Sequence, residues 1–325
     1  MALLLGTLIV GTDGSAQGTS KVHHVGWVHV ASPPPSPGAR VAHVGALPPL
    51  HVFRARLAER GYHEGANLVI HERWAGGDYR RIAEMASELA RRPVDVIFTA
   101  GTKTARIVQE AVKTTPVVVY SCDPFEHVAR LARHGGNVTG VTCMSTELSA
   151  KRLELLKEAV PAASRIVFFS DLEDAPAGLK IAQEAALRLG VRLPTVKFTE
   201  RADIPNALDA VAKERPDALY IYPDPIANAE RRQIAEFALK HRLPSMHAFR
   251  EYVDAGGLMS YGANSADMFT VMAEQVALIL NGAHPGDVPV RQAIRFELAI
   301  NLKTAKALRV TVPPPLLLRA DHVVE

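Results

Sequence analysis

Three loops at the ends of expected strands hold residues that could bind a small molecule. The first loop, residues 99–105, lies between an expected strand and an expected helix. Gly101 would let the backbone approach a ligand and Thr102 could cap the helix, so free amides and the helix dipole would suit an anion such as a carboxylate. An ordinary strand-to-helix turn with an N-cap explains the same residues, and the residues of this loop alone favour that interpretation. The position of Lys103 does not fit a Walker phosphate loop.

The second and third loops each contain an aspartate followed by proline. They are residues 121–124, with Ser121 and Asp123, and residues 222–225, with Asp224. Either carboxylate could accept a hydrogen bond from a ligand amine or hydroxyl, although Asp before Pro is also a common turn and helix-start signal. Two acids could suggest a general acid and base, but no nucleophile or glycine elbow accompanies them. The pattern therefore favours binding over catalysis, and we expect no enzyme.

Two later segments complete the candidate binding residues. Phe249 and Arg250 follow an expected strand at 245–248, and Tyr261 and Gly262 lie in a glycine-rich segment at 256–264. The aromatic rings could stack on a flat ligand, and the guanidinium could form a bidentate pair with a carboxylate. Each of these residues, taken alone, also fits a purely structural role.

Histidines and cysteines do not form a recognisable metal site. His23, His24 and His29 are close together, but strand alternation would place His23 and His24 on opposite faces, so we predict no metal and no cofactor. Cys122 and Cys143 lack zinc spacing. They could form a disulfide in an exported protein, and two buried free thiols are an equally good interpretation.

The elements that would position these residues alternate between strands and helices. Continuous apolar strands in such an order predict a parallel sheet covered on both faces. The pattern restarts after a glycine-rich crossover at 135–142, which predicts two successive α/β units. The expected strands span 24–30, 68–72, 94–99, 117–120, 166–170, 195–198, 218–222 and 245–248, and the expected helices span 50–61, 79–92, 102–113, 149–160, 178–189, 204–213, 229–241 and 267–280.

Length and charge agree with this organisation. The 325 residues fit two domains of about 150 residues each, and a net charge of +3 does not favour nucleic-acid binding. Residues 2–10 form an apolar run that is shorter than the roughly 20 residues needed to span a bilayer. Small residues follow it, and we expect a secretory signal peptide over residues 1–16, although no Lys or Arg precedes the run.

Seven short motifs occur in an order that resembles one known family. The motifs are residues 60–68 (RGYHEGANL), 94–102 (VDVIFTAGT), 136–140 (GNVTG), 151–157 (KRLELLK), 249–252 (FREY), 256–262 (GGLMSYG) and 301–308 (NLKTAKAL). Together they resemble the ABC-transporter substrate-binding family that includes tryptophan-binding proteins of the TrpX type, over residues 23–325.

The resemblance implies a type I periplasmic-binding-protein fold: α/β, with two doubly wound parallel-sheet lobes joined by a multi-strand hinge. The N-terminal lobe would comprise 22–141 and 263–288, and the C-terminal lobe 142–262 and 289–325. By the same resemblance, the helix start at Gly101-Thr102 would hold a ligand carboxylate. Asp123, Asp224 and the region of Tyr261 would line the cleft. The loop 31–49, with its proline run, is longer than is usual for the family at that border of the cleft.

The resemblance further implies a monomeric periplasmic receptor. It would close over an amino acid, aromatic or related in chemistry, and deliver it to an inner-membrane ABC permease. The sequence also leaves three alternative functions to consider. A ligand sensor for a membrane signalling partner would share every feature. A two-lobed transferase would need a phosphate-binding loop and a base, and a transcription regulator would need a DNA-binding segment before residue 23.

Overall fold

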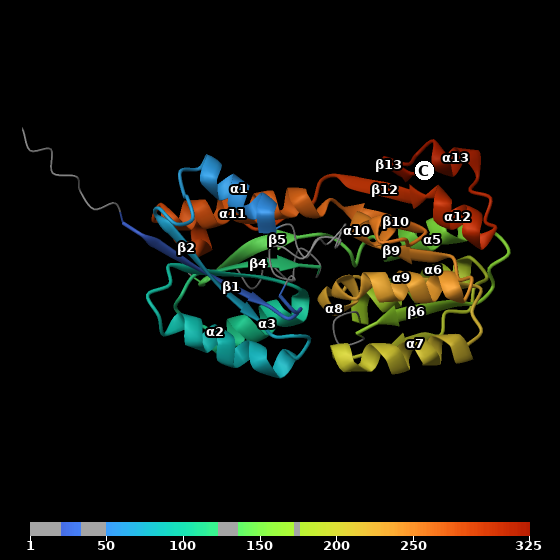
Figure 1. Ribbon diagram of the computed structural model, residues 1–325, viewed down its shortest axis with the longest axis horizontal. Helices are drawn as coiled ribbons and strands as arrows, with labels where there is room; N and C mark the ends of the chain where they lie inside the picture. The colour runs from blue at the N-terminus through green and yellow to red at the C-terminus, as the bar shows by residue number, and fades with distance from the viewer. Residues whose placement is uncertain (1–20, 34–49, 123–135, 172–175) are drawn as a thin grey trace, which may run out of the picture.

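The computed structural model describes residues 21–33, 50–122, 136–171 and 176–325. Two sheets organise these residues, and Figure 1 shows them side by side along the long axis of the molecule. We call the first sheet with its helices the first lobe and the second sheet with its helices the second lobe. The predicted signal peptide, Asp123 and most of the predicted long loop at 31–49 lie outside the described residues.

The first lobe is built on a six-stranded parallel sheet in the order β11-β5-β4-β3-β1-β2. Strands β3 and β4 are fully buried along their length, as expected for a sheet covered on both faces. The strands are β1 His23–His29, β2 Leu68–Trp74, β3 Val96–Ala100, β4 Val117–Ser121, β5 Val138–Thr142 and β11 Arg291–Gln292.

The second lobe is built on a seven-stranded sheet in the order β13-β12-β10-β9-β8-β6-β7. Its pairings are parallel except for that of β10 with β12, which is antiparallel. The strands are β6 Ile166–Ser170, β7 Thr195–Lys197, β8 Ala218–Ile221, β9 Ser245–His247, β10 Met259–Ala263, β12 Phe296–Asn301 and β13 His322–Val324.

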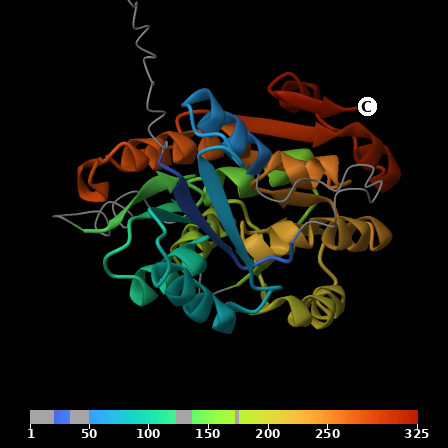
Figure 2. The same ribbon diagram turned by 60° about the vertical axis from the view of Figure 1, so that its left-hand side comes forward.

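Helices cover both faces of each sheet, and Figures 1 and 2 show α1 and α11 on the opposite side of the first sheet from α2 and α3. A core cluster joins α1 and α11 to the first sheet, a second joins α5 and α6 to the second sheet, and a third runs across both lobes through α2, α3, α7 and α9. The main helices are α1 Leu50–Glu59, α2 Ile82–Ala90, α3 Thr102–Ala111, α5 Ser149–Ala159, α6 Pro176–Arg188, α7 Ile204–Lys213, α9 Arg231–Lys240 and α11 Ser265–Leu280. The shorter ones are η1 Tyr79–Arg81, η2 Arg201–Asp203, α8 Pro225–Ala229, α10 Arg250–Asp254, η3 Pro285–Asp287, α12 Leu302–Leu308 and α13 Pro314–Leu317.

Several expected elements are divided or shifted. The helix expected at 79–92 begins as η1, because the Asp78 side chain accepts the amide hydrogen of Arg80, and continues as α2. The helix expected at 229–241 forms as α9, and a separate short helix, α8, precedes it because Pro225 and the Asp224 cap start a turn earlier in the chain. The crossovers expected at 135–142 and 256–264 contain strands β5 and β10.

The chain passes between the two lobes at three places among the described residues: after β5, between β10 and α11, and between β11 and β12. Arg152, which is fully buried, ties two of these passages together. Its Nε donates to the Tyr261 carbonyl at 2.6 Å and its Nη1 to the Ser145 carbonyl at 2.9 Å. This arginine therefore links the first and second passages between the lobes.

The lobe boundaries remain a prediction. At one boundary the pairing of the strands differs from it. We expected residues 289–325 in the C-terminal lobe, but Arg291 and Gln292 pair with β5 in the first sheet. The short strand precedes the third passage, so the polypeptide leaves the first lobe a few residues later than expected. No helix among the described residues is long and apolar enough to cross a membrane.

Candidate binding site between the lobes

A cavity opens where the carboxyl ends of the two sheets face each other. This is the edge at which open α/β sheets bind ligands. The cavity encloses about 60 Å³, several times the roughly 10–15 Å³ that one water molecule needs. Its wall contains residues from the first lobe (His29, Ala100, Gly101, Thr102, Tyr120, Cys122, Ser265 and Phe269) and from the second lobe (Tyr222, Pro223, Asp224, Pro225, Asn228, Phe249 and Glu251).

Four aromatic rings form the apolar part of the wall. Tyr120 and Phe269 meet edge to face in the first lobe, with ring centroids 5.9 Å apart. Tyr222 and Phe249 contribute from the second lobe, and all four side chains are buried. The Tyr120 hydroxyl has no partner among the described residues, and burial raises its pKa, so it stays a neutral hydrogen-bond donor. This wall suits a flat apolar group that carries a polar atom.

The start of α3 supplies an electropositive part of the wall. Gly101 has φ of 101°, and a Cβ there would lie 2.4 Å from Cγ of Pro225, so only glycine lets the lobes approach this closely. The hydroxyls of Thr102 and Ser121 lie 3.2 Å apart, and Thr102 Oγ1 accepts the amide hydrogen of Cys122. Ser121 is thus placed behind Thr102, not in the wall itself. The helix dipole of α3 favours an anion here.

Asp224 faces this helix start from the other lobe. Its Oδ1 accepts the amide hydrogens of Ile226 and Ala227 at 2.7 and 2.9 Å, so it caps α8. Its Oδ2 accepts from the Tyr79 hydroxyl at 3.4 Å. Burial raises the pKa of Asp224 to about 6; the charge of Asp171 adds to this, and the hydrogen bonds from Ala227, Ile226 and Tyr79 oppose it. Asp224 therefore starts the helix, as one interpretation of the sequence had it, and its carboxyl also lies in the cavity wall; its binding of a ligand stays a prediction.

Glu251 is a second acid in the wall that sequence reasoning missed. Burial raises its pKa, while the Ser265 hydroxyl and the charge of Arg231 lower it. Arg231 is itself buried and donates through Nη1 to the Asn228 carbonyl. The Oδ1 atom of Asn228 has no partner in the part of the chain that the structure describes. This corner therefore carries acceptors that could bind a ligand ammonium group.

His29, at the carboxyl end of β1, is another wall residue that was not predicted from the sequence. Its Nδ1 accepts the amide hydrogen of Ala31 at 3.0 Å, which assigns the ring proton to Nε2. Burial lowers the pKa of His29 to about 3, so it is a neutral donor in the wall. Its neighbours in the sequence have other roles, since His24 stacks on His71 and His23 packs edge to face on Tyr62. Among the described residues no three metal-binding side chains cluster.

The structure brings together Gly101, Thr102, Asp224 and Phe249 from the predicted set. It places four others outside the wall: Ser121, which lies behind Thr102, and Arg250, Tyr261 and Gly262. Arg250 points to Asp254 and Glu297, at 3.5 and 3.9 Å. Tyr261 contributes its carbonyl to Arg152. Gly262 packs against the Ala248 carbonyl, where a Cβ would lie at 2.3 Å.

The two cysteines form a disulfide that borders the cavity. It joins Cys122, in the wall after β4, to Cys143, which is fully buried just after β5. Thr146 Oγ1 donates to the Cys122 carbonyl at 3.2 Å and lies 3.1 Å from the Tyr222 hydroxyl of the second lobe. The disulfide alternative is therefore the one that the structure adopts, and it anchors the wall to the first passage between the lobes.

Similar proteins share this architecture. A tyrosine-binding protein of Clostridioides difficile (strain R20291) is 25% identical over 262 residues, which cover 79% of this chain and 75% of that protein. A conserved domain protein of Vibrio cholerae has a solved structure with a TM-score of 0.81 at 26% identity, covering 93% of this chain and all of that one. An ABC domain of Streptococcus pneumoniae in complex with L-Trp has a TM-score of 0.79 at 22% identity, covering 94% and 100%.

The family assignment rests on nearly the whole described chain. The two sheets and their covering helices form a type I periplasmic-binding-protein fold, as the resemblance implied. Residues 41–324 match the model of one protein family. This range contains every residue of the cavity wall except His29. The chain belongs to the ABC transporter substrate-binding protein family.

Proposed function

We propose that this protein is an extracytoplasmic receptor that binds an amino acid with an aromatic side chain and delivers it to an ABC import permease. The observation that carries the proposal is the composition of the cavity wall. One cavity between the lobes is lined by four aromatic rings, by the start of the ten-residue helix α3 and by two buried carboxyl groups. An aromatic amino acid carries the three matching groups.

Each part of the ligand would have a distinct partner. The carboxylate would bind beside Gly101 and Thr102, where the dipole of α3 favours an anion. The ammonium group would bind Glu251 and Asp224 in the second lobe. The ring would lie among Tyr120, Phe249 and the other two aromatic side chains. A ligand of this kind contacts both lobes at once.

Contacts with both lobes provide the mechanism that we propose for delivery. Only the closed arrangement offers all of these groups to one ligand, so binding would shift the equilibrium toward closure. The permease would then recognise the closed shape. The ligand leaves the receptor chemically unchanged, because the role of the wall is to bind and orient. Relatives named for tyrosine and for L-Trp support the choice of ligand class.

Thermal unfolding against a library of amino acids tests this proposal. A ligand that binds only the folded protein at about 100 times its dissociation constant should stabilise it by roughly 2.7 kcal/mol. We expect aromatic L-amino acids to raise the unfolding temperature and to be recovered unchanged after incubation. No shift with any amino acid, or recovery of a new product, would contradict the proposal.

Adjacent residues offer a matched pair of variants. Phe249→Ala removes a ring from the wall, whereas Arg250→Ala changes a side chain that lies outside the wall and is 42% exposed. The ligand-induced shift should fall in Phe249→Ala and persist in Arg250→Ala, each measured relative to the same variant without ligand. An equal loss in both variants would argue that the ligand binds elsewhere.

A further inference from the structure

His29 brings a histidine ring to the first-lobe side of the cavity wall. It is the last residue of β1, and it is 3% exposed. Strand β1 pairs in parallel with β3, with Val28 beside Thr99. The next step of this register brings His29 level with Ala100, the residue before Gly101 and the start of α3. The ring therefore lines the cavity next to the helix start at which the proposed ligand carboxylate would bind.

Packing and a hydrogen bond hold the ring of His29 in one orientation. It stacks on the indole of Trp27, with ring centroids 5.1 Å apart, and its centroid lies 5.5 Å from that of Trp74. Its Nδ1 accepts the amide hydrogen of Ala31 at 3.0 Å. The other ring nitrogen, Nε2, therefore carries the proton and is a donor. A donor that is held in this way loses little conformational freedom when it binds a ligand.

The charge of the ring also suits a carboxylate partner. Burial lowers the pKa of His29 to about 3, so the ring is uncharged at neutral pH. A buried imidazolium would be costly before an anion arrives, whereas a neutral N–H group costs much less. Its hydrogen bond to a carboxylate would still be a strong one, because the acceptor is charged.

Donors at the start of α3 are already engaged in part within the protein. The amide of Gly101 donates to the Tyr120 carbonyl at 2.8 Å. The Thr102 hydroxyl lies 3.2 Å from that of Ser121 and accepts the amide hydrogen of Cys122. A carboxylate can accept several hydrogen bonds through its two oxygens. A side-chain donor beside the helix start would therefore complete a site that the helix dipole favours.

We infer that His29 binds the ligand carboxylate through its Nε2–H group, next to the start of α3. This inference rests on the proposed function, because it assigns a partner to one group of the amino acid. It makes His29 a specificity-determining residue, which favours ligands with a free carboxylate over their amides.

Two substitutions separate the roles of the two ring nitrogens. In His29→Asn the side-chain oxygen can take the place of Nδ1 and accept from Ala31, but no atom replaces the Nε2–H donor. In His29→Gln the side-chain amide can reach the position of Nε2, but the acceptor for Ala31 is lost. We expect titration calorimetry with L-tryptophan, L-tyrosine and L-phenylalanine to show an affinity lowered roughly 10- to 100-fold in His29→Asn and kept within about threefold in His29→Gln.

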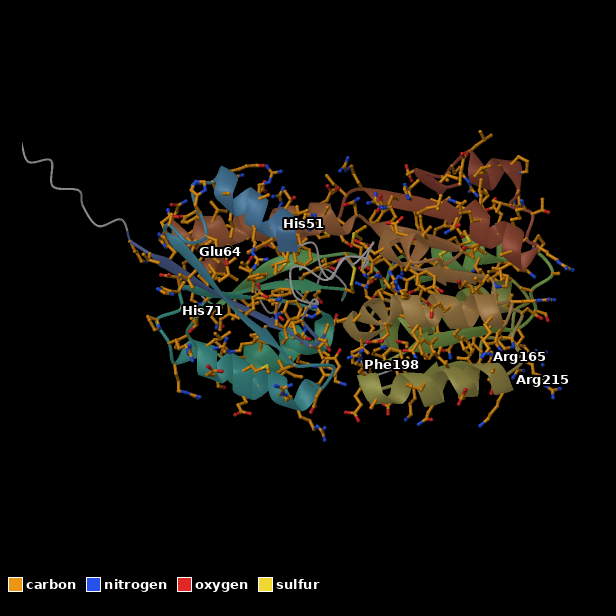
Figure 3. The ribbon with its side chains drawn as sticks, viewed as in Figure 1. His51, Glu64, His71, Arg165, Phe198 and Arg215 are labelled. Carbon is orange, nitrogen blue, oxygen red and sulfur yellow. A yellow bond between two sulfur atoms is a disulfide. The ribbon has the colours of Figure 1, made fainter. Side chains whose placement is uncertain are left out.

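The carboxamides of the same amino acids identify the group that His29 contacts. An amide carries no negative charge, so it should bind wild type and His29→Asn with similar affinity. The control is His71→Asn. His71 lies outside the wall, with its Nε2 2.9 Å from Nδ1 of His24, and Figure 3 shows it on the part of the first lobe away from the second. This variant should bind the amino acids as wild type does, and each variant is first checked for a cooperative thermal transition.

Two results would overturn the role of His29. One is full affinity in His29→Asn with a loss in His29→Gln, which would mean that the ring acts by holding Ala31. The other is an equal loss in His29→Asn for the amino acids and for their amides. If wild type binds none of the three amino acids, the proposed function fails and the role of His29 fails with it, and this result is distinct from the other two.

Discussion

Asp224 combines a structural role with a place in the cavity wall. Its Oδ1 caps α8 through two backbone amides, while its Oδ2 faces Tyr79 at the boundary between the lobes. The cap fixes the rotamer, and burial keeps the carboxyl away from water. A group held in this way can change its charge without moving, so its state of protonation becomes a property of the closed site.

Folding stability should depend on the protonation of Asp224. Burial raises the pKa of this carboxyl to about 6 from an ordinary value of 3.8, so the folded protein binds the proton more tightly than the unfolded chain does. The stabilising contribution is therefore complete below about pH 4 and is lost as the pH rises through 6. The free energy of unfolding that is lost between pH 4 and pH 6 is on the order of 3 kcal/mol.

Asp224→Asn isolates this contribution, because asparagine also caps helices well and does not titrate. We expect the free energy of unfolding of wild type relative to the variant to fall by that amount from pH 4 to pH 7. Urea denaturation at both pH values measures it. A difference between the two proteins that does not change with pH would show that Asp224 titrates normally.

Some residues of the wall could be predicted from the sequence because of their position after a strand. Gly101, Thr102, Asp224 and Phe249 each follow the end of a buried strand, where parallel sheets bind ligands. Glu251 and Phe269 could not be found in this way, because they lie inside helices α10 and α11. Their contribution depends on how these helices pass over the cavity, which the local sequence pattern does not encode.

At the scale of elements, the first lobe depends on a covalent connection. The disulfide Cys122–Cys143 joins the end of β4 to the turn after β5, over a separation of 21 residues. Both strands are already paired in the sheet, so the bond adds to an existing contact. The disulfide also fixes the cavity wall next to Tyr222 of the second lobe.

The double variant Cys122→Ala/Cys143→Ala should be less stable by about 3 kcal/mol, because a crosslink that closes a loop of this length restricts the unfolded chain by that amount. Urea denaturation under oxidising conditions measures the difference. Wild type in a thiol reductant should match the variant, which separates the effect of the bond from that of the substitutions. Equal stability of the two proteins would argue that the thiols are unpaired in solution.

The sequence pattern was not sufficient to predict some of the shorter elements. The amphipathic run at 229–241 predicted one helix, which forms as α9, but it did not predict the short helix α8 that precedes it. Pro225 and the cap by Asp224 start α8 early, and both signals lie outside the periodic segment that predicted the helix. The two residues of β11 have no pattern of their own and join the first sheet only through β5.

At the scale of the molecule, the alternation of strands and helices was enough to predict two α/β lobes with parallel sheets, and the resemblance to a known family supplied the type I periplasmic-binding-protein fold. Continuous buried strands such as β3, β4 and β6 require helices on both faces, and a restart of the pattern requires a second sheet. The distance between the lobes could not be predicted, because it rests on single contacts such as Gly101 with Pro225 and Lys103 with Asp171. These contacts join residues that are far apart in the chain.

The proposed function also depends on the arrangement of the two lobes. A receptor needs a closed state whose wall is complete and an open state that lets the ligand enter. In this structure the aromatic wall, the start of α3 and the two acids face one another across the cavity.

Equilibrium dialysis of the protein against aromatic L-amino acids tests the central claim most directly, with mass spectrometry of the contents on both sides of the membrane. The account predicts saturable binding of one molecule per chain, weakened in Phe249→Ala and kept in Arg250→Ala, with the amino acid chemically intact. Equal concentrations on both sides at every protein concentration, or conversion of the amino acid into another compound, would contradict it.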